Sequence, residues 1–330
     1  MRMAYFLASG AALLAATLSA CEPFQPRVVA VVVTSIPTFT PIPTVTPTPT
    51  VTRTPLPSPT PDWTPTPTPF PCEETGGQLL EFRDNPSPST NENIRYLVYL
   101  PPCYGSSARR FPVLYLIHGM SYREQQWLDL GLPNILNEAI LAGRSAPFVV
   151  VMPFLGSIGG QDRFPPNPSY ETVIVDELRP QIESTFCTIN TAQGRAIGGI
   201  SRGGFWAYSI AMRHNNLFGQ VGGFSAYFPA NAGLPPANDP LELVLNETPL
   251  RESGLRMYLA NGAADSSGPS QQLFSARLSA RGIQHTYVVH PSGEHNNDYW
   301  RAHLAEFLAW FSQPWTREYS LLPSCAEPSP

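Results

Sequence analysis

The chain has 330 residues, of which 38 are proline and five are cysteine, and its formal net charge is −5. This charge gives no electrostatic basis for binding nucleic acid or an anionic membrane surface. No Cys-x-x-Cys pair occurs, which disfavours a zinc ribbon or a thioredoxin-type redox site.

Residues 1–20 have the pattern of an export signal, with Arg2 followed by the apolar stretch 5–18, which is too short to span a membrane as a permanent helix. The segment ends in Leu18-Ser19-Ala20-Cys21, which resembles the lipobox of bacterial lipoproteins. We expect lipidation of Cys21 to anchor the protein to the bacterial cell membrane, outside the cytoplasm. The alternative is an ordinary signal peptide cleaved after Ala20.

Residues 21–36 form a short tether, and residues 37–71 form a low-complexity linker in which 25 of 35 residues are proline or threonine. Such a composition cannot bury a core and favours extended polyproline II. Fully extended, the linker would reach about 110 Å. We therefore expect a stalk that precedes a folded domain at residues 72–330.

In the domain, short apolar runs alternate with helical patterns. We expect strands at 94–100, 111–117, 148–153, 195–200, 221–227, 255–260 and 285–290, and helices at 132–142, 170–186, 205–212, 271–280 and 299–311. Pro180 lies inside the second of these helices. Continuously apolar strands that alternate with helices predict an α/β fold, with a mainly parallel sheet covered by helices on both faces.

The segment Gly199-Ile200-Ser201-Arg202-Gly203 has the Gly-x-Ser-x-Gly spacing of a nucleophile elbow. In such an elbow the serine occupies a strained turn between a strand and a helix, and the glycines allow the helix to pass close to the strand. The expected strand before Ser201 and the apolar, proline-free segment after it supply this context. The alternative is a glycine-rich structural turn with an incidental serine.

Four motifs together resemble the esterase D / feruloyl esterase-like branch of the α/β-hydrolases, which is similar to the enterochelin esterases and the antigen 85 mycolyltransferases. They are Tyr115-Leu116-Ile117-His118-Gly119, the elbow followed by Gly204, Asn261-Gly262-Ala263-Ala264-Asp265 and Gly293-Glu294-His295. The resemblance covers roughly residues 90–313 and excludes the Pro/Thr tract. It implies the α/β-hydrolase fold and a Ser-acid-His catalytic set.

In this family the three residues follow in the chain order serine, acid, histidine. Ser201 is then the nucleophile, and His295, in a glycine-containing loop before the last helix, is the base, with His290 as the alternative. Asp265 directly follows an expected strand and is the candidate acid, although it could instead cap a turn. The other acids considered are Asp239, Glu294 and Asp298.

The resemblance also implies an oxyanion hole made by backbone N–H groups, and the candidates are those of Met120 and Arg202. The Arg202 side chain, at a position where the family often has methionine or leucine, is a candidate to bind substrate. Trp127, Tyr227 and Trp300 fall near the expected catalytic edge of the sheet and are candidates to line a substrate pocket, or are ordinary core residues.

Four cysteines remain after Cys21, and an exported protein meets oxidising conditions, so we expect two disulfides. Three pairings are possible. We favour Cys72–Cys325, which would join the two ends of the domain, and Cys103–Cys187, because both of these cysteines lie in loops leading into strands.

The sequence therefore predicts a serine carboxylic-ester hydrolase that acts outside the cytoplasm through an acyl-enzyme, on a small-molecule or polysaccharide ester such as an acylated polysaccharide or a feruloyl or acetyl ester. The alternatives are an acyltransferase of the cell envelope and a non-catalytic binding module. We expect no cofactor and no catalytic metal, because no His-x-His or His-Glu-x-x-His motif occurs. The sequence does not indicate an oligomeric state.

Overall fold

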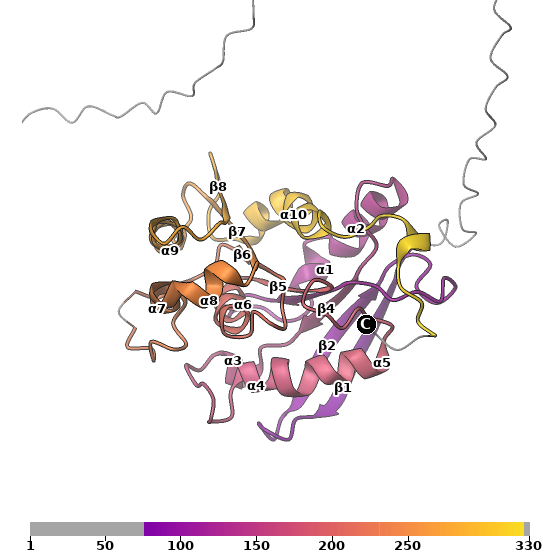
Figure 1. Ribbon diagram of the computed structural model, residues 1–330, viewed down its shortest axis with the longest axis horizontal. Helices are drawn as coiled ribbons and strands as arrows, with labels where there is room; N and C mark the ends of the chain where they lie inside the picture. Colours follow the sequence, from indigo (N-terminus) through magenta and orange to yellow (C-terminus); the bar gives the residue numbers. More distant parts are fainter. Residues whose placement is uncertain (1–75, 231, 327–330) are drawn as a thin grey trace, which may run out of the picture. The chain divides into compact units, whose positions relative to one another are not determined.

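The computed structural model describes residues 76–230 and 232–326 (Figure 1). The predicted signal peptide, the tether, the linker and the residues Cys21 and Cys72 lie outside the described residues. Within the described ranges, no helix combines the length and the apolar character needed to cross a membrane.

Eight strands form one sheet in the order β1-β2-β4-β3-β5-β6-β7-β8. The first two pairings, β1 with β2 and β2 with β4, are antiparallel, and the others are parallel. The predicted mainly parallel sheet is thus confirmed. The strands are β1 (Gln78–Pro86), β2 (Asn93–Leu100), β3 (Val113–Ile117), β4 (Val149–Pro153), β5 (Arg195–Ile200), β6 (Gln220–Phe224), β7 (Arg256–Gly262) and β8 (Thr286–His290).

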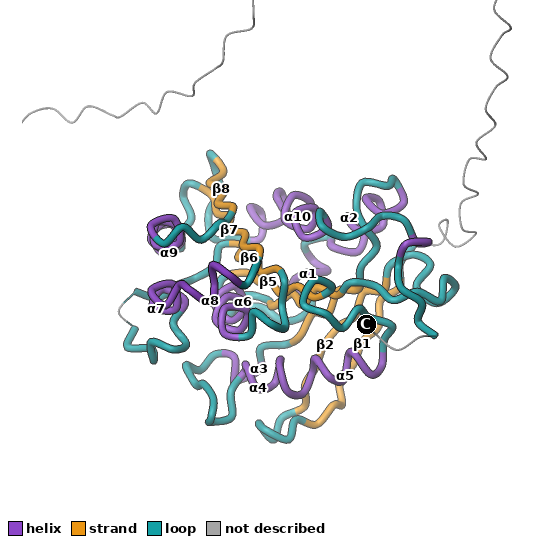
Figure 2. Tube along the Cα trace, viewed as in Figure 1, coloured by secondary structure: helices purple, strands orange, loops and turns teal. Residues whose placement is uncertain are grey.

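Helices cover both faces of the sheet (Figures 1 and 2). One face packs against α1 (Gln126–Asp129), α2 (Leu132–Leu141) and α10 (Asn297–Ser312). The opposite face packs against α3 (Gly156–Gly159), α4 (Tyr170–Thr172), the π-helix η2 (Val173–Leu178), α5 (Arg179–Thr185), α6 (Arg202–Arg213), α7 (Pro240–Leu243), the 3₁₀ turn η3 (Val244–Asn246), α8 (Glu247–Glu252) and α9 (Gly268–Ala280). A last 3₁₀ turn, η4 (Tyr319–Leu321), follows α10.

Strand β3 shows why the central strands are apolar without interruption. Val113, Tyr115 and Ile117 enter the core on the α6 face, whereas Leu114 and Leu116 enter the core on the α10 face. All five side chains are fully buried, because successive residues of a strand point to opposite faces and both faces are covered.

Three local features differ from the prediction. Strand β1 was not expected, because it is a mostly exposed edge strand without regular alternation of apolar residues. The expected helix at 170–186 contains the π-helical turn η2 directly before Pro180, which has no N–H with which to continue regular helical hydrogen bonding. Strand β6 ends at Phe224, because Ser225 adopts a positive φ of 53°.

The predicted cysteine pairing is wrong. Cys187 is bonded to Cys325, with their Cα atoms 5.7 Å apart, which excludes both Cys72–Cys325 and Cys103–Cys187. Cys103 is also disulfide-bonded. The reason is the course of the C-terminal segment, which returns to the residues before β3: the Cys325 N–H donates to the Ala108 carbonyl, while the Phe111 N–H donates to the Cys187 carbonyl.

Candidate active site

Ser201 lies between β5 and α6 in a strained backbone conformation, with φ of 55° and ψ of −116°. A Cβ atom on Gly199 would overlap the Gly203 backbone, and one on Gly203 would overlap the carbonyl oxygens of Ile117 and His118. Only glycine therefore allows α6 to start this close to β5 and β3. The turn presents the serine at the edge of the sheet formed by the C-terminal ends of the parallel strands.

The structure brings Ser201, His295 and Asp265 into one hydrogen-bonded chain. The His295 Nε2 atom is 2.9 Å from Ser201 Oγ, and its Nδ1 atom is 2.8 Å from Asp265 Oδ1. The Asp265 side chain is fully buried, and that of His295 is 26 % exposed. A hydroxyl, an imidazole and a carboxylate are thus in the order and at the spacing that acyl transfer requires of a nucleophile, a base and an acid.

The Asp265 carboxylate is held by several donors. Its Oδ1 atom also accepts the Ser267 N–H and the Ser267 hydroxyl, each at 2.8 Å. Burial raises the pKa of this carboxyl group, but its interactions with His295, Ser225 and Ser267 outweigh burial and leave the pKa below its usual value. Asp265 therefore carries its negative charge at neutral pH, beside the imidazole.

The loops that carry Asp265 and His295 are joined to each other beyond the ends of β7 and β8. The Ala263 N–H donates to the His290 carbonyl at 2.9 Å, and the Ala264 N–H donates to the Gly293 carbonyl at 3.0 Å. These two bonds continue the β7–β8 pairing into the loops, so the acid and the histidine are positioned as one unit.

Trp300 packs against the His295 ring. Its indole is 1 % exposed, donates from Nε1 to Ser225 Oγ at 2.8 Å, and meets the His295 ring edge to face with centroids 5.1 Å apart. The expectation that Trp300 lines a substrate pocket is therefore replaced by a role in packing against the histidine.

Trp127 is fully buried and stacks on Phe307 in the core below α10, so the expectation that it contacts substrate is wrong. The sequence placed it near the catalytic edge but could not show that α1 turns it inward.

Tyr227 differs from both tryptophans. It is 48 % exposed, and its N–H donates to the Ser201 carbonyl at 3.0 Å, which keeps it close to the serine.

The loop after β3 is held from two sides. The His118 Nε2 atom accepts the Leu155 N–H at 2.9 Å, so Nδ1 carries the proton and donates to the Gly119 carbonyl at 2.7 Å. Burial lowers the pKa of His118 to about 4, so this imidazole is neutral at neutral pH. The Gly119 N–H donates to Gln126 Oε1 at 2.9 Å. Met120, whose backbone N–H is a candidate oxyanion donor, directly follows Gly119.

Gln126 was missed by sequence reasoning. It is buried on α1, and its Nε2 atom donates to Asn297 Oδ1 at 3.0 Å, at the start of α10. One amide side chain thus connects the Gly119 loop with the helix that follows the His295 loop. A single glutamine in a short helix carries no sequence signal of this role, because the role depends on two partners distant in the chain.

The Arg202 side chain is buried and hydrogen-bonded to the 159–162 loop, which argues against the expectation that it binds substrate. Its guanidinium donates to the Gly159 carbonyl at 3.1 Å, to the Gln161 carbonyl at 2.9 Å and to Asp162 Oδ1 at 2.6 Å. It also lies over the rings of Phe205 and Trp206. The Arg202 backbone, by contrast, is at the first position of α6, where N–H groups have no intrahelical acceptor.

None of the alternative acids, nor the alternative base His290, is part of the chain of hydrogen bonds at Ser201. The Asp239 side chain caps α7 by accepting the Leu241 N–H at 2.9 Å, and Asp298 pairs with Arg301 on the surface of α10. Glu294 is exposed. His290 is bound to Tyr299 and to Glu306.

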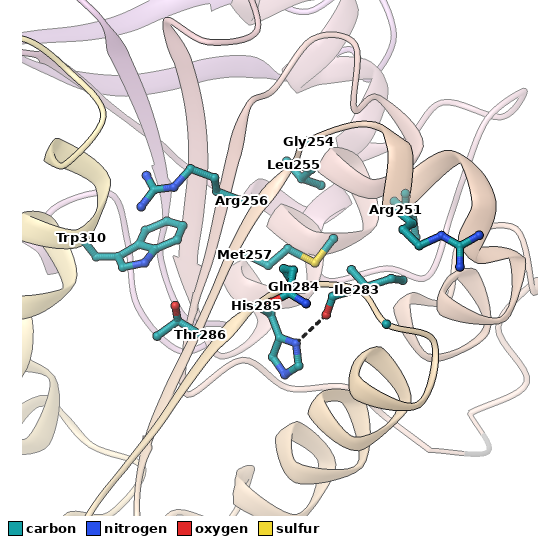
Figure 3. A pocket seen from close by; sticks show the side chains of 12 residues that line it. Arg251, Gly254, Leu255, Arg256, Met257, Ile283, Gln284, His285, Thr286 and Trp310 are labelled. Atoms are coloured by element: carbon teal, nitrogen blue, oxygen red, sulfur yellow. Dashed lines mark hydrogen bonds between the residues drawn. The ribbon is translucent and has the colours of Figure 1, made fainter. Parts of the chain in front are cut away.

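A cavity of about 420 Å³ is remote from these residues (Figure 3). It is lined by residues at the starts of β7 and β8, among them Arg256, Met257 and Thr286, with Trp310 of α10. The Ser201, Asp265 and His295 positions follow the opposite ends of the parallel strands. This cavity is therefore not part of the candidate active site.

Comparisons with known proteins show which family and which fold the chain resembles. Residues 87–311 match the model of the Esterase family, described as "Putative esterase". A protein named endo-1,4-beta-xylanase/feruloyl esterase from Xylanibacter ruminicola is 34% identical over 165 residues, which are 46% of this chain and 22% of that protein. Esterase Rv1288 from Mycobacterium tuberculosis is 33% identical over 132 residues, 39% of this chain and 28% of that one. The chain thus spans about a quarter of the length of these curated relatives.

Among solved structures, a ferulic acid esterase aligns with a TM-score of 0.65 at 23% identity, covering 73% of this chain and 98% of that one. The S-formylglutathione hydrolase FrmB from Staphylococcus aureus aligns with a TM-score of 0.62 at 18% identity, covering 72% of this chain and 98% of that one. These likenesses show the α/β-hydrolase fold.

Proposed function

From the premise that the chain belongs to the Esterase family, we propose that it is a serine carboxylic-ester hydrolase with Ser201, His295 and Asp265 as its catalytic triad. The observation that carries the proposal is the hydrogen-bonded chain from Ser201 Oγ through both nitrogens of His295 to Asp265 Oδ1. A serine hydroxyl is a weak nucleophile by itself, and an adjacent neutral imidazole is what activates it.

In the acylation step, Ser201 Oγ attacks the ester carbonyl carbon and its proton passes to His295 Nε2. The carboxylate of Asp265 stabilises the imidazolium that forms. The tetrahedral intermediate then collapses as the C–O bond to the alcohol breaks, and His295 gives its proton to the departing alkoxide. Water attacks the resulting acyl-enzyme in the same way, which releases the carboxylic acid and restores Ser201.

The negative oxygen of the intermediate is stabilised by the backbone N–H groups of Met120 and Arg202. Support comes from their surroundings: the Gly119 N–H, which precedes that of Met120, is already used by Gln126, and Arg202 opens α6. An N–H group at a helix start has no acceptor of its own and favours negative charge nearby.

We place the enzyme outside the cytoplasm, acting on acylated polysaccharide or on feruloyl or acetyl esters. The substrate class is supported by the name of the Xylanibacter ruminicola relative, which includes feruloyl esterase. The location is supported by the sequence pattern: a signal peptide at 1–20, lipidation at Cys21, a tether at 21–36 and a Pro/Thr-rich linker at 37–71, followed by the esterase domain at 72–330. The exposed Tyr227 is the candidate substrate contact.

The test is a comparison of the wild-type protein with Ser201→Ala and with Ser266→Ala, a matched control at an exposed serine beside Asp265. Turnover of p-nitrophenyl acetate and of methyl ferulate should disappear in S201A and persist in S266A. A fluorophosphonate probe should label the peptide that contains residue 201 in the wild type and in S266A but not in S201A. Equal turnover by wild type and S201A, or none by a folded wild type, would contradict the proposal.

A further inference from the structure

Two histidines and a glutamate meet where the end of β8 lies against α10. His290 ends β8, while His303 and Glu306 lie three residues apart on α10. The His290 Nε2 atom is 3.0 Å from Glu306 Oε2, and His303 Nδ1 is 3.9 Å from the same oxygen. The two imidazole rings are stacked with centroids 3.5 Å apart. One ligand atom from each residue lies within 4.8 Å of the other two.

Outer contacts orient this His290/His303/Glu306 cluster. The Tyr299 hydroxyl is 2.9 Å from His290 Nδ1, which leaves Nε2 to face the glutamate. The Tyr258 hydroxyl donates to Glu306 Oε1 at 3.1 Å, which leaves Oε2 to face the two histidines. Metal ligands in proteins are oriented in this manner, with the second atom of each imidazole or carboxylate held by a neighbouring polar group.

We propose that His290, His303 and Glu306 form a binding site for a divalent transition-metal ion of the Zn²⁺ class. Two imidazole nitrogens and one carboxylate oxygen are ligands that Zn²⁺ accepts, at about 2.0–2.2 Å each, and water would complete the coordination. Glu306 is 49 % exposed and His303 is 28 % exposed, so the ion can enter from solvent.

The three donor atoms must move closer to hold the ion. Bonds of about 2.1 Å in a tetrahedral site place ligand atoms about 3.4 Å apart, whereas the largest separation here reaches 4.8 Å. A rotation of the half-exposed Glu306 side chain and of the His303 ring supplies this movement. His290, which is only 12 % exposed and is held by Tyr299, is the fixed member.

A bound ion would join the end of β8 to α10 and so fasten both ends of the loop that carries His295. It takes no part in the proposed ester hydrolysis, and the site stands whether or not that function is correct. Because the ion binds folded protein, a hundredfold excess of Zn²⁺ over the dissociation constant should raise the Tm by about 5 °C.

The experiment uses untagged full-length protein treated with a chelator and dialysed. Calorimetric titration with ZnCl₂ should give one ion per chain. Glu306→Gln and His303→Ala should each weaken binding at least tenfold and lose the Tm rise. Asp298→Asn, which removes an exposed acid from the same helix, and His285→Gln, which removes a histidine outside the cluster, should bind as wild type does.

Absence of stoichiometric binding in the wild type overturns the proposal. Binding that persists unchanged in both E306Q and H303A also overturns it, because the ion would then occupy another place in the chain. If H303A fails to fold, E306Q decides alone, since it keeps the size of the side chain and the hydrogen bond from Tyr258.

Discussion

Replacing Asp265 by asparagine removes one charge from the candidate triad with almost no change in shape. An asparagine side-chain oxygen can still accept the Ser267 N–H, so we expect the loop to remain folded. What disappears is the negative charge beside His295, which would stabilise the imidazolium.

The size of the effect follows from the geometry. Before reaction the imidazole is neutral, and in the transition state it becomes an imidazolium with Nδ1 2.8 Å from the carboxylate oxygen. Two unit charges at that distance attract by about 6 kcal/mol at an effective dielectric constant of about 20. Because this attraction exists only in the transition state, its loss lowers kcat by about 10⁴-fold and leaves KM nearly unchanged.

The assay is steady-state hydrolysis of p-nitrophenyl acetate by wild type and D265N, with thermal unfolding to verify the fold. E294Q and D298N serve as matched controls, because each removes an acid from the same region, and both should stay within about twofold of wild type. The reasoning is refuted if folded D265N retains more than a tenth of wild-type kcat. A large loss in either control would assign the acid's role to that residue instead.

Three further predictions concern residues around the site. Because the folded pKa of His118 is about 4, below its ordinary value, the unfolded chain takes up a proton first as the pH falls, so folding stability drops by about 3 kcal/mol between pH 6.5 and 4. The free energy of unfolding, measured with urea across this pH range, should fall in the wild type but not in H118Q. The same pH dependence in both proteins would contradict the prediction. Arg202→Met should speed amide hydrogen exchange at residues 156–162 at least tenfold, because the Gln161 carbonyl and Asp162 lose their donor and the Gly159 carbonyl keeps only the one from Trp206. D162N keeps the bonds to both carbonyls and should change exchange less, and unchanged exchange in R202M would refute the assigned role. The double variant C187A/C325A should lose about 4–5 kcal/mol of stability, since the bond closes a loop of 138 residues, and an unaltered urea midpoint would argue against it.

The sequence predicted the fold well where a pattern belongs to one stretch of chain. The elbow is such a case: its glycines are required by contacts with the next helix and the neighbouring strand, and the requirement is visible in five consecutive residues. The apolar runs of the central strands are another, because burial on both faces leaves no polar position.

Prediction failed where the role of a residue depends on its contacts with segments that are distant in the sequence. Gln126 is unremarkable in its helix, yet it hydrogen-bonds Gly119 and Asn297 at once. Cys325 meets Cys187 because the C-terminal segment returns to the residues before β3, a path that no local signal in the chain indicates.

Strand β1 and Trp127 show two other limits. The edge strand is mostly exposed, and of its apolar residues only Leu80 and Phe82 pack against the core, which is too short a pattern to predict a strand. Trp127 could not be assigned from sequence, because an aromatic residue near a catalytic edge can line a pocket or belong to the core. The packing of α1 against α10 places it in the core.

The two ends of the described domain lie on the same side of it. Gln78 pairs with Leu100, next to the start of β4, and Ser324 pairs with Arg109, just before the start of β3. Ser201, Asp265 and His295 all follow the opposite ends of the strands. Attachment of the described domain to a bead or an electrode at residue 76 or at residue 326 would therefore leave the serine facing the solution, so the immobilised domain should keep full access to dissolved esters.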